Sequence, residues 1–341
     1  HYNRGGGAFT FLLAVNQRNF AGTLAWVLIV GYVLTNAVYA VTFGEYLGHV
    51  IGLGPWVPRV TGIAIIALFI LLNLRGVGVT GGVEILLVWF KVVALLGLAS
   101  WGLIHWNPPA LSQGVPDASL LAALFGAASV FMAYEGFQLL TYDYEDIDNP
   151  KRTLPRAVLS AIIVVILIYV MVALGTTMLI GADQVILHKE VALAIAGEKA
   201  FGTVGLVLVT IAAAFSTGSA INATLFATAR LTHRVALDGE LPAAVDHHNR
   251  QGAPDRAVIG LGVIAAVLVA TGSLIALVEA ASLTFLFTFA VVCTLAFRLR
   301  AGHRLITGFG ALTGALACVE LVVQLLQSDP LALVFLGVLV L

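Results

Sequence analysis

Residues 119–156 read SLLAALFGAASVFMAYEGFQLLTYDYEDIDNPKRTLPR, and the middle of this stretch places a carboxyl group and a glycine inside an apolar run. A carboxyl group in hydrocarbon costs several kcal/mol unless it faces a cavity or a partner. Glycine allows the backbone to leave the helical conformation. Glu135 beside Gly136 therefore predicts a membrane helix that is interrupted near its centre. The alternative is a continuous helix whose Glu135 faces a neighbouring helix.

The composition is that of a polytopic membrane protein. Of the 341 residues, 60% are hydrophobic and 10% are charged, whereas a soluble domain carries about a quarter charged residues. The 17 Lys and Arg nearly balance the 18 Asp and Glu, so there is no basic field that would attract nucleic acid. Cys293 and Cys318 lie far apart in apolar runs and indicate small core residues, not a metal site or a disulfide framework.

Apolar runs set the expected number of helices. Runs long enough to cross about 30 Å of hydrocarbon fall at residues 22–47, 57–74, 83–104, 119–142, 156–180, 203–232, 257–278, 280–299 and 304–326. A tenth run, 330–341, stops short, and the chain opens without an initiator methionine. We therefore expect an all-α chain of about ten membrane helices, forming one transmembrane domain over residues 1–341 and belonging to a longer protein.

The basic residues suggest an orientation for these helices. If residues 1–21 are cytoplasmic, most Lys and Arg fall on the cytoplasmic side, and only Arg59, Lys189 and Lys199 lie on the far side. This asymmetry follows the positive-inside rule and was not used to place the helices. We expect a multi-pass protein of the cell membrane, surrounded by lipid.

Lys91 is the second ionisable group placed deep in an apolar run. It lies about nine residues into the run 83–104, where an ammonium group is costly unless it finds a partner or loses its proton. Such a lysine can titrate in the physiological range, as a proton-coupled device requires. The alternative is a permanent ion pair, with Glu135 as one candidate partner.

Two other runs carry polar side chains at unusual density. Tyr32, Thr35, Asn36 and Tyr39 recur on one face of the run 22–47, where they either line a path or join helices. The run 203–232 contains Ser216, Thr217, Ser219 and Asn222. These groups either bond to neighbouring helices and their own backbone, or supply oxygen ligands to a cation or to an ammonium group such as that of Lys91.

The motif residues of the opening stretch carry a family resemblance. In order they are Phe131, Ala133, Gly136-Phe137, Glu145, Asn149-Pro150, Arg152 and Pro155-Arg156-Ala157. This pattern resembles the sixth transmembrane helix and following loop of the amino acid–polyamine–organocation (APC) transporter superfamily. Residues 84–91, EILLVWFK, are similar to the fifth helix of that family, and residues 230–254 are similar to the loop after its eighth helix. Residues 5–20 resemble the segment after its second helix.

The resemblance implies a LeuT-type fold with a five-plus-five inverted repeat. We expect it to be incomplete at both ends, because the first two helices of the family precede this register and the last run, 330–341, is cut short. It implies a transporter of amino acids or polyamines that works by alternating access around the interrupted helix at 131–137. The implied substrate site comprises Phe131, Met132, Ala133, Tyr134, Glu135, Gly136 and Ile221. Lys91 would couple a proton to transport, held by Ser216 and Thr217 at the place that sodium takes in related carriers.

Several alternatives remain beside proton-coupled symport. An exchanger of amino acids or polyamines would need no net proton movement, and a ligand sensor would keep the fold without moving cargo. A proton-channel subunit would need charged residues on several successive helices, and Lys91 with Glu135 is too small a set. No pair of nucleophile and base and no metal constellation stands out, so we expect neither an enzyme nor a bound metal or cofactor. Residues 188–201 are amphipathic and predict either an outer lid or an inert surface helix. We expect the last three runs to be mostly scaffold.

Overall fold

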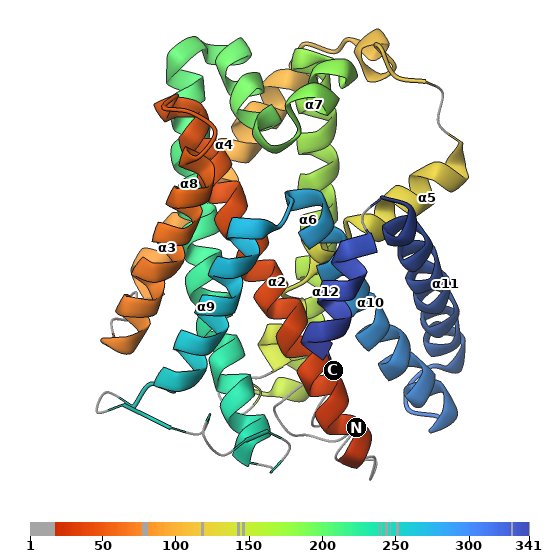
Figure 1. The fold of residues 1–341 in the computed structure, drawn as a ribbon. Helices are drawn as coiled ribbons and strands as arrows, with labels where there is room; N and C mark the ends of the chain where they lie inside the picture. Colours follow the sequence, from red (N-terminus) through yellow and green to blue (C-terminus); the bar gives the residue numbers. More distant parts are fainter. Residues whose placement is uncertain are drawn as a thin grey trace. The chain divides into compact units, whose positions relative to one another are not determined.

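A computed structural model describes residues 18–76, 81–116, 119–141, 144, 147–237, 239, 241–242, 245, 247–249, 252–328 and 330–340. Throughout these ranges the chain forms α-helices and short 3-10 helices and no strand (Figure 1). The long helices are α2 (Arg18–Ile51), α3 (Val57–Leu74), α4 (Gly81–Ile104), α6 (Pro150–Ile180), α8 (Ala192–Leu237), α10 (Leu274–Arg298) and α11 (Arg304–Ser328). The shorter ones are α5 (Leu120–Ser129), α7 (Ala182–His188), α9 (Asp255–Thr271) and α12 (Pro330–Val340).

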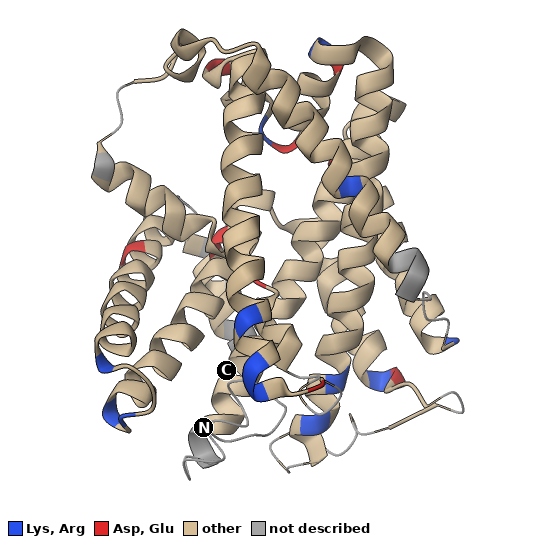
Figure 2. Ribbon diagram, turned by 180° about the vertical axis from the view of Figure 1, so that it is seen from behind, with Lys and Arg blue, Asp and Glu red and all other residues tan. Residues whose placement is uncertain are grey.

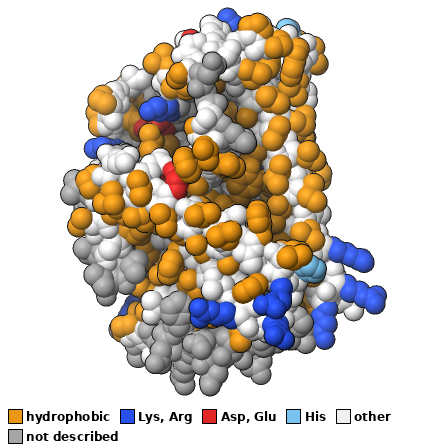
Figure 3. Space-filling model, turned by 90° about the vertical axis from the view of Figure 1, so that its right-hand side faces the viewer, with side chains coloured by type: hydrophobic (Ala, Val, Ile, Leu, Met, Phe, Trp, Pro, Cys, Tyr) orange, Lys and Arg blue, Asp and Glu red, His pale blue; other side chains and the backbone are white. Residues whose placement is uncertain are grey.

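Seven spans within the described residues are long and apolar enough to cross a membrane. Charged residues lie mostly near the helix ends and in the connections (Figure 2), and hydrophobic side chains cover much of the face shown in Figure 3. Along α11 the exposed side chains include Leu305, Phe309, Leu312, Leu316 and Val319, a stripe of apolar groups that suits a lipid environment. The prediction of an all-α, multi-pass membrane protein is confirmed.

Two predicted helix boundaries are wrong. Helix α6 begins at Pro150, not at residue 156, because a proline at the first helical position has no N–H to leave unpaired. The runs expected at 257–278 and 280–299 are divided near residue 272 instead. Helix α9 ends at Thr271, where the following Gly272 is extended. Ser273 caps α10, which begins at Leu274, because its Oγ accepts a hydrogen bond from the Ala276 N–H at 3.2 Å.

The chain forms two compact units, each built from separate stretches of the sequence. The first unit comprises His1–Ala37, Ser119–Ile162 and Thr224–Leu341. The second unit comprises Val38–Ala118 and Ile163–Ala223. Helices α2, α6 and α8 contribute one part to each unit.

The core of the first unit lies where α5, α10 and α11 pack together. Helices α10 and α11 lie side by side along much of their length (Figure 1). The buried side chains of this core are Ala128 of α5, Leu283 and Leu286 of α10, and Leu321 and Leu325 of α11. Helix α10 also contacts the segment that follows α5, so it supports the chain at the point where the sequence predicts an interruption.

In the second unit, glycines bring α4 and α6 into backbone contact. A Cβ added at Gly102 would lie 2.1 Å from the carbonyl oxygen of Gly175. A Cβ added at Gly175 would in turn lie 2.5 Å from the carbonyl oxygen of Ala99. Close approach of small residues is a common way for membrane helices to pack, and here it ties α4, the helix that carries Lys91, to α6.

Helix α8 is interrupted near its beginning. Phe201 (φ −135°) and Gly202 (φ 62°) leave the helical conformation. The segment expected to be amphipathic, 188–201, therefore forms the end of α7, the 3-10 turn η5 (Lys189–Val191) and the first turns of α8. Whether this segment closes a vestibule stays a prediction.

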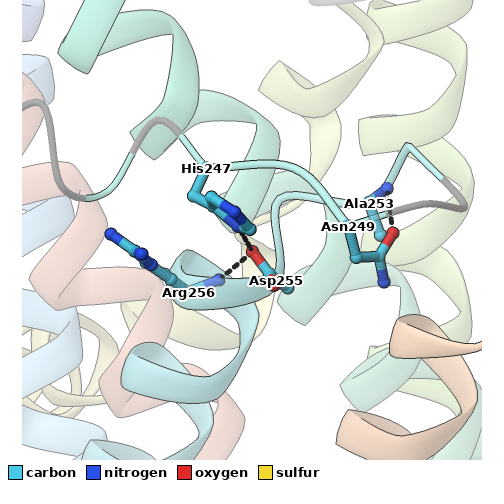
Figure 4. A network of polar contacts seen from close by, with 5 residues as sticks. All are labelled: His247, Asn249, Ala253, Asp255 and Arg256. Carbon is cyan, nitrogen blue, oxygen red and sulfur yellow. Dashed lines mark hydrogen bonds and ion pairs between the residues drawn. The ribbon is translucent and has the colours of Figure 1, made fainter.

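A polar network orders the connection between α8 and α9 (Figure 4). The His247 Nδ1 lies 2.7 Å from the Asp255 Oδ1, which also accepts the Arg256 N–H at 2.9 Å. The Asn249 Oδ1 accepts the Ala253 N–H at 3.0 Å. The hydrogen bond to His247 lowers the pKa of Asp255 below its ordinary value of 3.8. This loop is held by specific contacts, with His247 itself half exposed.

Candidate functional site

The helix that begins at α5 is interrupted where the sequence predicts it. Helix α5 ends at Ser129 and is followed by the 3-10 helix η2 (Phe131–Tyr134). Glu135 is extended, with φ −65° and ψ 149°, and Gly136 has φ +123°. A second 3-10 helix, η3 (Phe137–Thr141), follows. The prediction of an interrupted helix is confirmed, and we call residues 130–136 the break.

Gly136 permits this change of direction because a positive φ is strained for residues that carry a Cβ. A Cβ built at Gly136 would meet nothing within 4 Å. The requirement for glycine is therefore conformational and not a matter of space.

Five backbone N–H groups at the break find partners within the protein, and that of Val130 donates to the Ala128 carbonyl. The Ala133 N–H donates to the Val130 carbonyl at 2.9 Å, and the Glu135 N–H donates to the Met132 carbonyl at 3.0 Å. The Met132 N–H donates to the Ser282 Oγ at 2.9 Å, and the Gly136 N–H donates to the Gln138 Oε1 at 3.2 Å. With these donors occupied, the polar groups that the break can offer to a ligand are predominantly carbonyl and carboxylate oxygens.

Gln138 connects Glu135 to α2. Its Nε2 donates to the Glu135 Oε1 at 2.6 Å and to the Tyr32 hydroxyl oxygen at 3.3 Å. Its Oε1 accepts the Gly136 N–H. Both N–H donors and one of the two oxygen lone pairs of this carboxamide are thereby used at the break. Glu135, the carboxyl group that the sequence marks as costly, thus has a neutral donor as a partner.

Aromatic rings fix the two sides of the break. The ring of Phe131 meets that of Phe289 edge to face, with centroids 5.9 Å apart. Phe137 stacks on the same ring at 5.5 Å. Tyr32 makes an edge contact with Phe285 at 5.4 Å. Because Phe285 and Phe289 both belong to α10, this helix positions the break with rings as well as with a hydroxyl group.

The side chains of the predicted substrate site differ in burial. Met132 is 4% exposed and belongs to the core. Phe131, Tyr134 and Glu135 are partly buried, and Ala133 is exposed. The sequence-based prediction therefore includes one residue, Met132, whose side chain packs inside the first unit and contributes its backbone to the break.

The second unit holds the residues predicted to couple a proton. Lys91 is partly buried on α4. The neighbouring Phe90 meets Phe215 of α8 edge to face, with centroids 6.3 Å apart. Phe215 directly precedes Ser216 and Thr217, so this contact brings the α4 turn that carries Lys91 against the α8 turn that carries both hydroxyl groups.

Two hydroxyl groups of this part of α8, those of Thr217 and Ser219, donate hydrogen bonds to carbonyl groups of their own helix. Thr217 donates to the Ala213 carbonyl at 2.8 Å, and Ser219 donates to the Ser216 carbonyl at 3.0 Å. Their oxygen atoms keep lone pairs for another donor. Ile221 is 1% exposed. Asn222 accepts a hydrogen bond from Asn73 of α3 at 2.9 Å, so this polar residue of the α8 cluster joins two helices.

The sequence-based analysis missed the role of α10. We expected the last three apolar runs to be mostly scaffold, but Ser282 of α10 bonds to the break, and Glu279 of the same helix accepts a hydrogen bond from the Gln324 Nε2 at 2.7 Å. The signal was present as Glu279, Ser282, Thr284 and Thr288, four polar residues in ten positions of an apolar helix.

Comparison with known proteins places the chain in a family. The model of the amino acid permease family matches residues 1–337. The chain belongs to this family, which lies within the APC superfamily. The predicted family membership is therefore confirmed, and the protein is assigned to permeases and not to enzymes.

Curated relatives share about a third to a quarter of their residues with this chain. An uncharacterised protein of Methanocaldococcus jannaschii is 33% identical over 232 residues, which are 67% of this chain and 53% of that protein. The inner membrane transport protein YbaT of Escherichia coli is 32% identical over 240 residues, 70% of this chain and 55% of its own length. The serine/threonine exchanger SteT of Bacillus subtilis is 25% identical over 244 residues, 70% and 55% respectively. The chain thus spans about half the length of these relatives.

Proposed function

We propose that the protein is a secondary active transporter of amino acids whose substrate binds at the break. The observation that carries the proposal is the hydrogen bonding of residues 130–136. Five N–H groups there donate to partners inside the protein, so the break presents mainly acceptors. Backbone carbonyl oxygens suit a cationic amino group, and irregular backbone at membrane depth is tolerated where it lines a cavity.

The neighbouring side chains would complete the site. Phe131, supported by Phe289, would cover the substrate as an aromatic gate, and Tyr134 would shape the pocket for the substrate side chain. Glu135 would either favour a cationic substrate or carry a proton itself.

A proton is the proposed coupling ion, in preference to sodium. Protonated Lys91, held by Ser216 and Thr217, would stabilise one facing state, and its deprotonation would stabilise the other. A ligand biases an equilibrium only through its differential affinity for the two states. The contact between Phe90 and Phe215 supports this role, because it brings the relevant turns of α4 and α8 together.

Uptake into empty proteoliposomes tests the proposal. The protein in its full natural length would be reconstituted and offered radiolabelled L-serine, L-threonine, L-glutamate, L-arginine, L-lysine and putrescine, with and without an inward proton gradient. We expect uptake of at least one amino acid to depend on the gradient. Absence of uptake for all the amino acids, into empty vesicles and into vesicles preloaded with unlabelled amino acid alike, would refute the proposal.

Exchange is the second candidate function, because one relative is named a serine/threonine exchanger. An exchanger would show little uptake into empty vesicles and strong uptake into vesicles preloaded with an unlabelled amino acid. A symporter would accumulate label in empty vesicles when the outside is acidic. The ratio of the two uptake rates therefore separates the two modes of transport.

A further inference from the structure

The hydroxyl group of Ser282 joins α10 to both sides of the interrupted helix. Ser282 is 0% exposed. Its Oγ accepts the Met132 N–H at 2.9 Å and donates to the Ser129 carbonyl at 2.8 Å. One side chain thus contacts the last residue of α5 and the second residue of η2, although it lies 150 or more positions away in the sequence.

These two backbone groups are ones that lose their helical partners at the break. In a continuous α-helix the Met132 N–H would donate to the Ala128 carbonyl, and the Ser129 carbonyl would accept the Ala133 N–H. Here the Ala133 N–H donates to Val130, and the Ala128 carbonyl accepts the Val130 N–H. The Ser282 hydroxyl therefore replaces one lost donor and one lost acceptor at the same time.

Other buried hydroxyl groups of α10 do not leave their own helix in this way. Thr284 donates to the Ala281 carbonyl at 2.7 Å, and Thr288 donates to the Thr284 carbonyl at 2.8 Å. Both side chains are as deeply buried as Ser282, at 3% and 1% exposed. The difference lies in bonding and not in burial, and Thr288 therefore provides a matched control.

We propose that Ser282 is a positioning residue for transport: its hydroxyl holds the break open against α10, in the conformation that binds substrate. Buried backbone groups without partners are costly in a membrane. Without the hydroxyl, the Met132 N–H and the Ser129 carbonyl lose this partner, and the break should move away from α10 and expose both groups to exchange more often. The role of Ser282 in transport rests on the proposed function, whereas its stabilisation of the break by hydrogen bonds does not.

Two measurements on Ser282→Ala test the inference. The first is amide hydrogen exchange of the purified protein in nanodiscs, with overlapping peptides that resolve Met132. We expect exchange at Met132 to rise about tenfold, the size associated with loss of a buried hydrogen-bond partner. Thr288→Val should leave this amide unchanged, and Ser282→Thr, which keeps the hydroxyl, should restore protection.

The second measurement is uptake of the amino acid that the panel above identifies. In Ser282→Ala we expect the half-saturation concentration to rise about tenfold, while the amount of monodisperse protein matches that of Thr288→Val. If Ser282→Ala does not fold, Ser282→Cys, with a weaker hydrogen-bonding thiol, should show a smaller rise in both measurements.

The outcomes separate the two proposals. Unchanged amide hydrogen exchange at Met132 in Ser282→Ala would overturn the proposal that Ser282 stabilises the break. Raised exchange with unchanged uptake kinetics would overturn its role in positioning. A wild-type protein that transports no amino acid would refute the proposed function, while the exchange measurement would still decide whether Ser282 holds the break.

Discussion

Replacing Gly136 by alanine tests the break with a single methyl group. The φ of this residue is +123°, and a Cβ placed there would have no atom within 4 Å. The substitution therefore adds backbone strain and no steric clash. A residue with a Cβ in a sparsely populated backbone conformation costs about 1–3 kcal/mol. At about 1.4 kcal/mol for each factor of ten, the interrupted conformation would lose roughly fivefold to 140-fold in population against a more helical one.

The assay is the initial rate of amino acid uptake as a function of substrate concentration. We expect kcat/KM to fall by a factor in that range, because substrate would bind to the interrupted conformation alone. Gly126→Ala is the matched control. Gly126 lies within α5, its Cβ would also meet nothing within 4 Å, and alanine inside a helix is favourable by about 0.5–1 kcal/mol.

The two variants together give a sharp criterion. We expect Gly136→Ala to fold normally and to lose much of its kcat/KM. We expect Gly126→Ala to transport normally. Equal transport by both variants would show that the positive φ at Gly136 is not needed for function, and the reasoning about the break would be wrong.

Four further predictions concern charge, packing and pH. Glu135→Gln removes a charge, and we expect the preference for cationic over neutral amino acids to change by about tenfold; indifference of both substrate preference and pH dependence would exclude a role for this carboxylate. Lys91→Ala should bring the ratio of uptake in acidic and neutral buffer to about one, while exchange between preloaded vesicles persists. Gly102→Ala forces a methyl group to within 2.1 Å of the Gly175 carbonyl, and we expect the melting temperature to fall by about 5 °C, whereas an unchanged value would contradict the close approach. His247→Ala should raise the pKa of Asp255 toward 3.8 in a carboxyl NMR titration. Since that pKa is lowered in the folded protein, the stabilisation by Asp255 is present above pH 3.8 and is lost as the pH falls through the lowered pKa.

The position of the break was predictable because two independent sequence signals, a carboxyl group in an apolar run and an adjacent glycine, coincide at one place. A carboxyl group in hydrocarbon needs a cavity or a partner, and glycine is the residue that most readily leaves a helix. Glu135 and Gly136 satisfy both conditions within an otherwise apolar run. The extended Glu135 and the positive φ of Gly136 are what such a pair requires.

The groups that stabilise the break were not predictable in the same way. Ser282 is a single hydroxyl within an apolar helix, and serines in such helices commonly bond to their own backbone. Its partners lie 150 and 153 residues away in the sequence, so no local pattern reports them. Gln138 was visible beside the break, but its bond to Tyr32 depends on the packing of α2 against η3.

Helix boundaries show a second limit of apolar patterns. Hydropathy measures the transfer of side chains into lipid and says nothing about backbone hydrogen bonds. The run across residues 257–299 therefore looked divisible near residue 279, although Gly272 and Ser273 end one helix and cap the next. The glycine and serine pair was the better indicator, because capping depends on the residue type at the helix end.

A structure of the protein with a bound amino acid would test the central claim most directly. We predict that residues 131–136 stay outside the α-helical conformation and that the ammonium nitrogen of the ligand lies about 2.7–3.2 Å from backbone carbonyl oxygens of the break. The Met132 N–H should still donate to Ser282. A continuous α-helix through Gly136, or an amino acid bound with no contact to residues 131–136, would contradict the account.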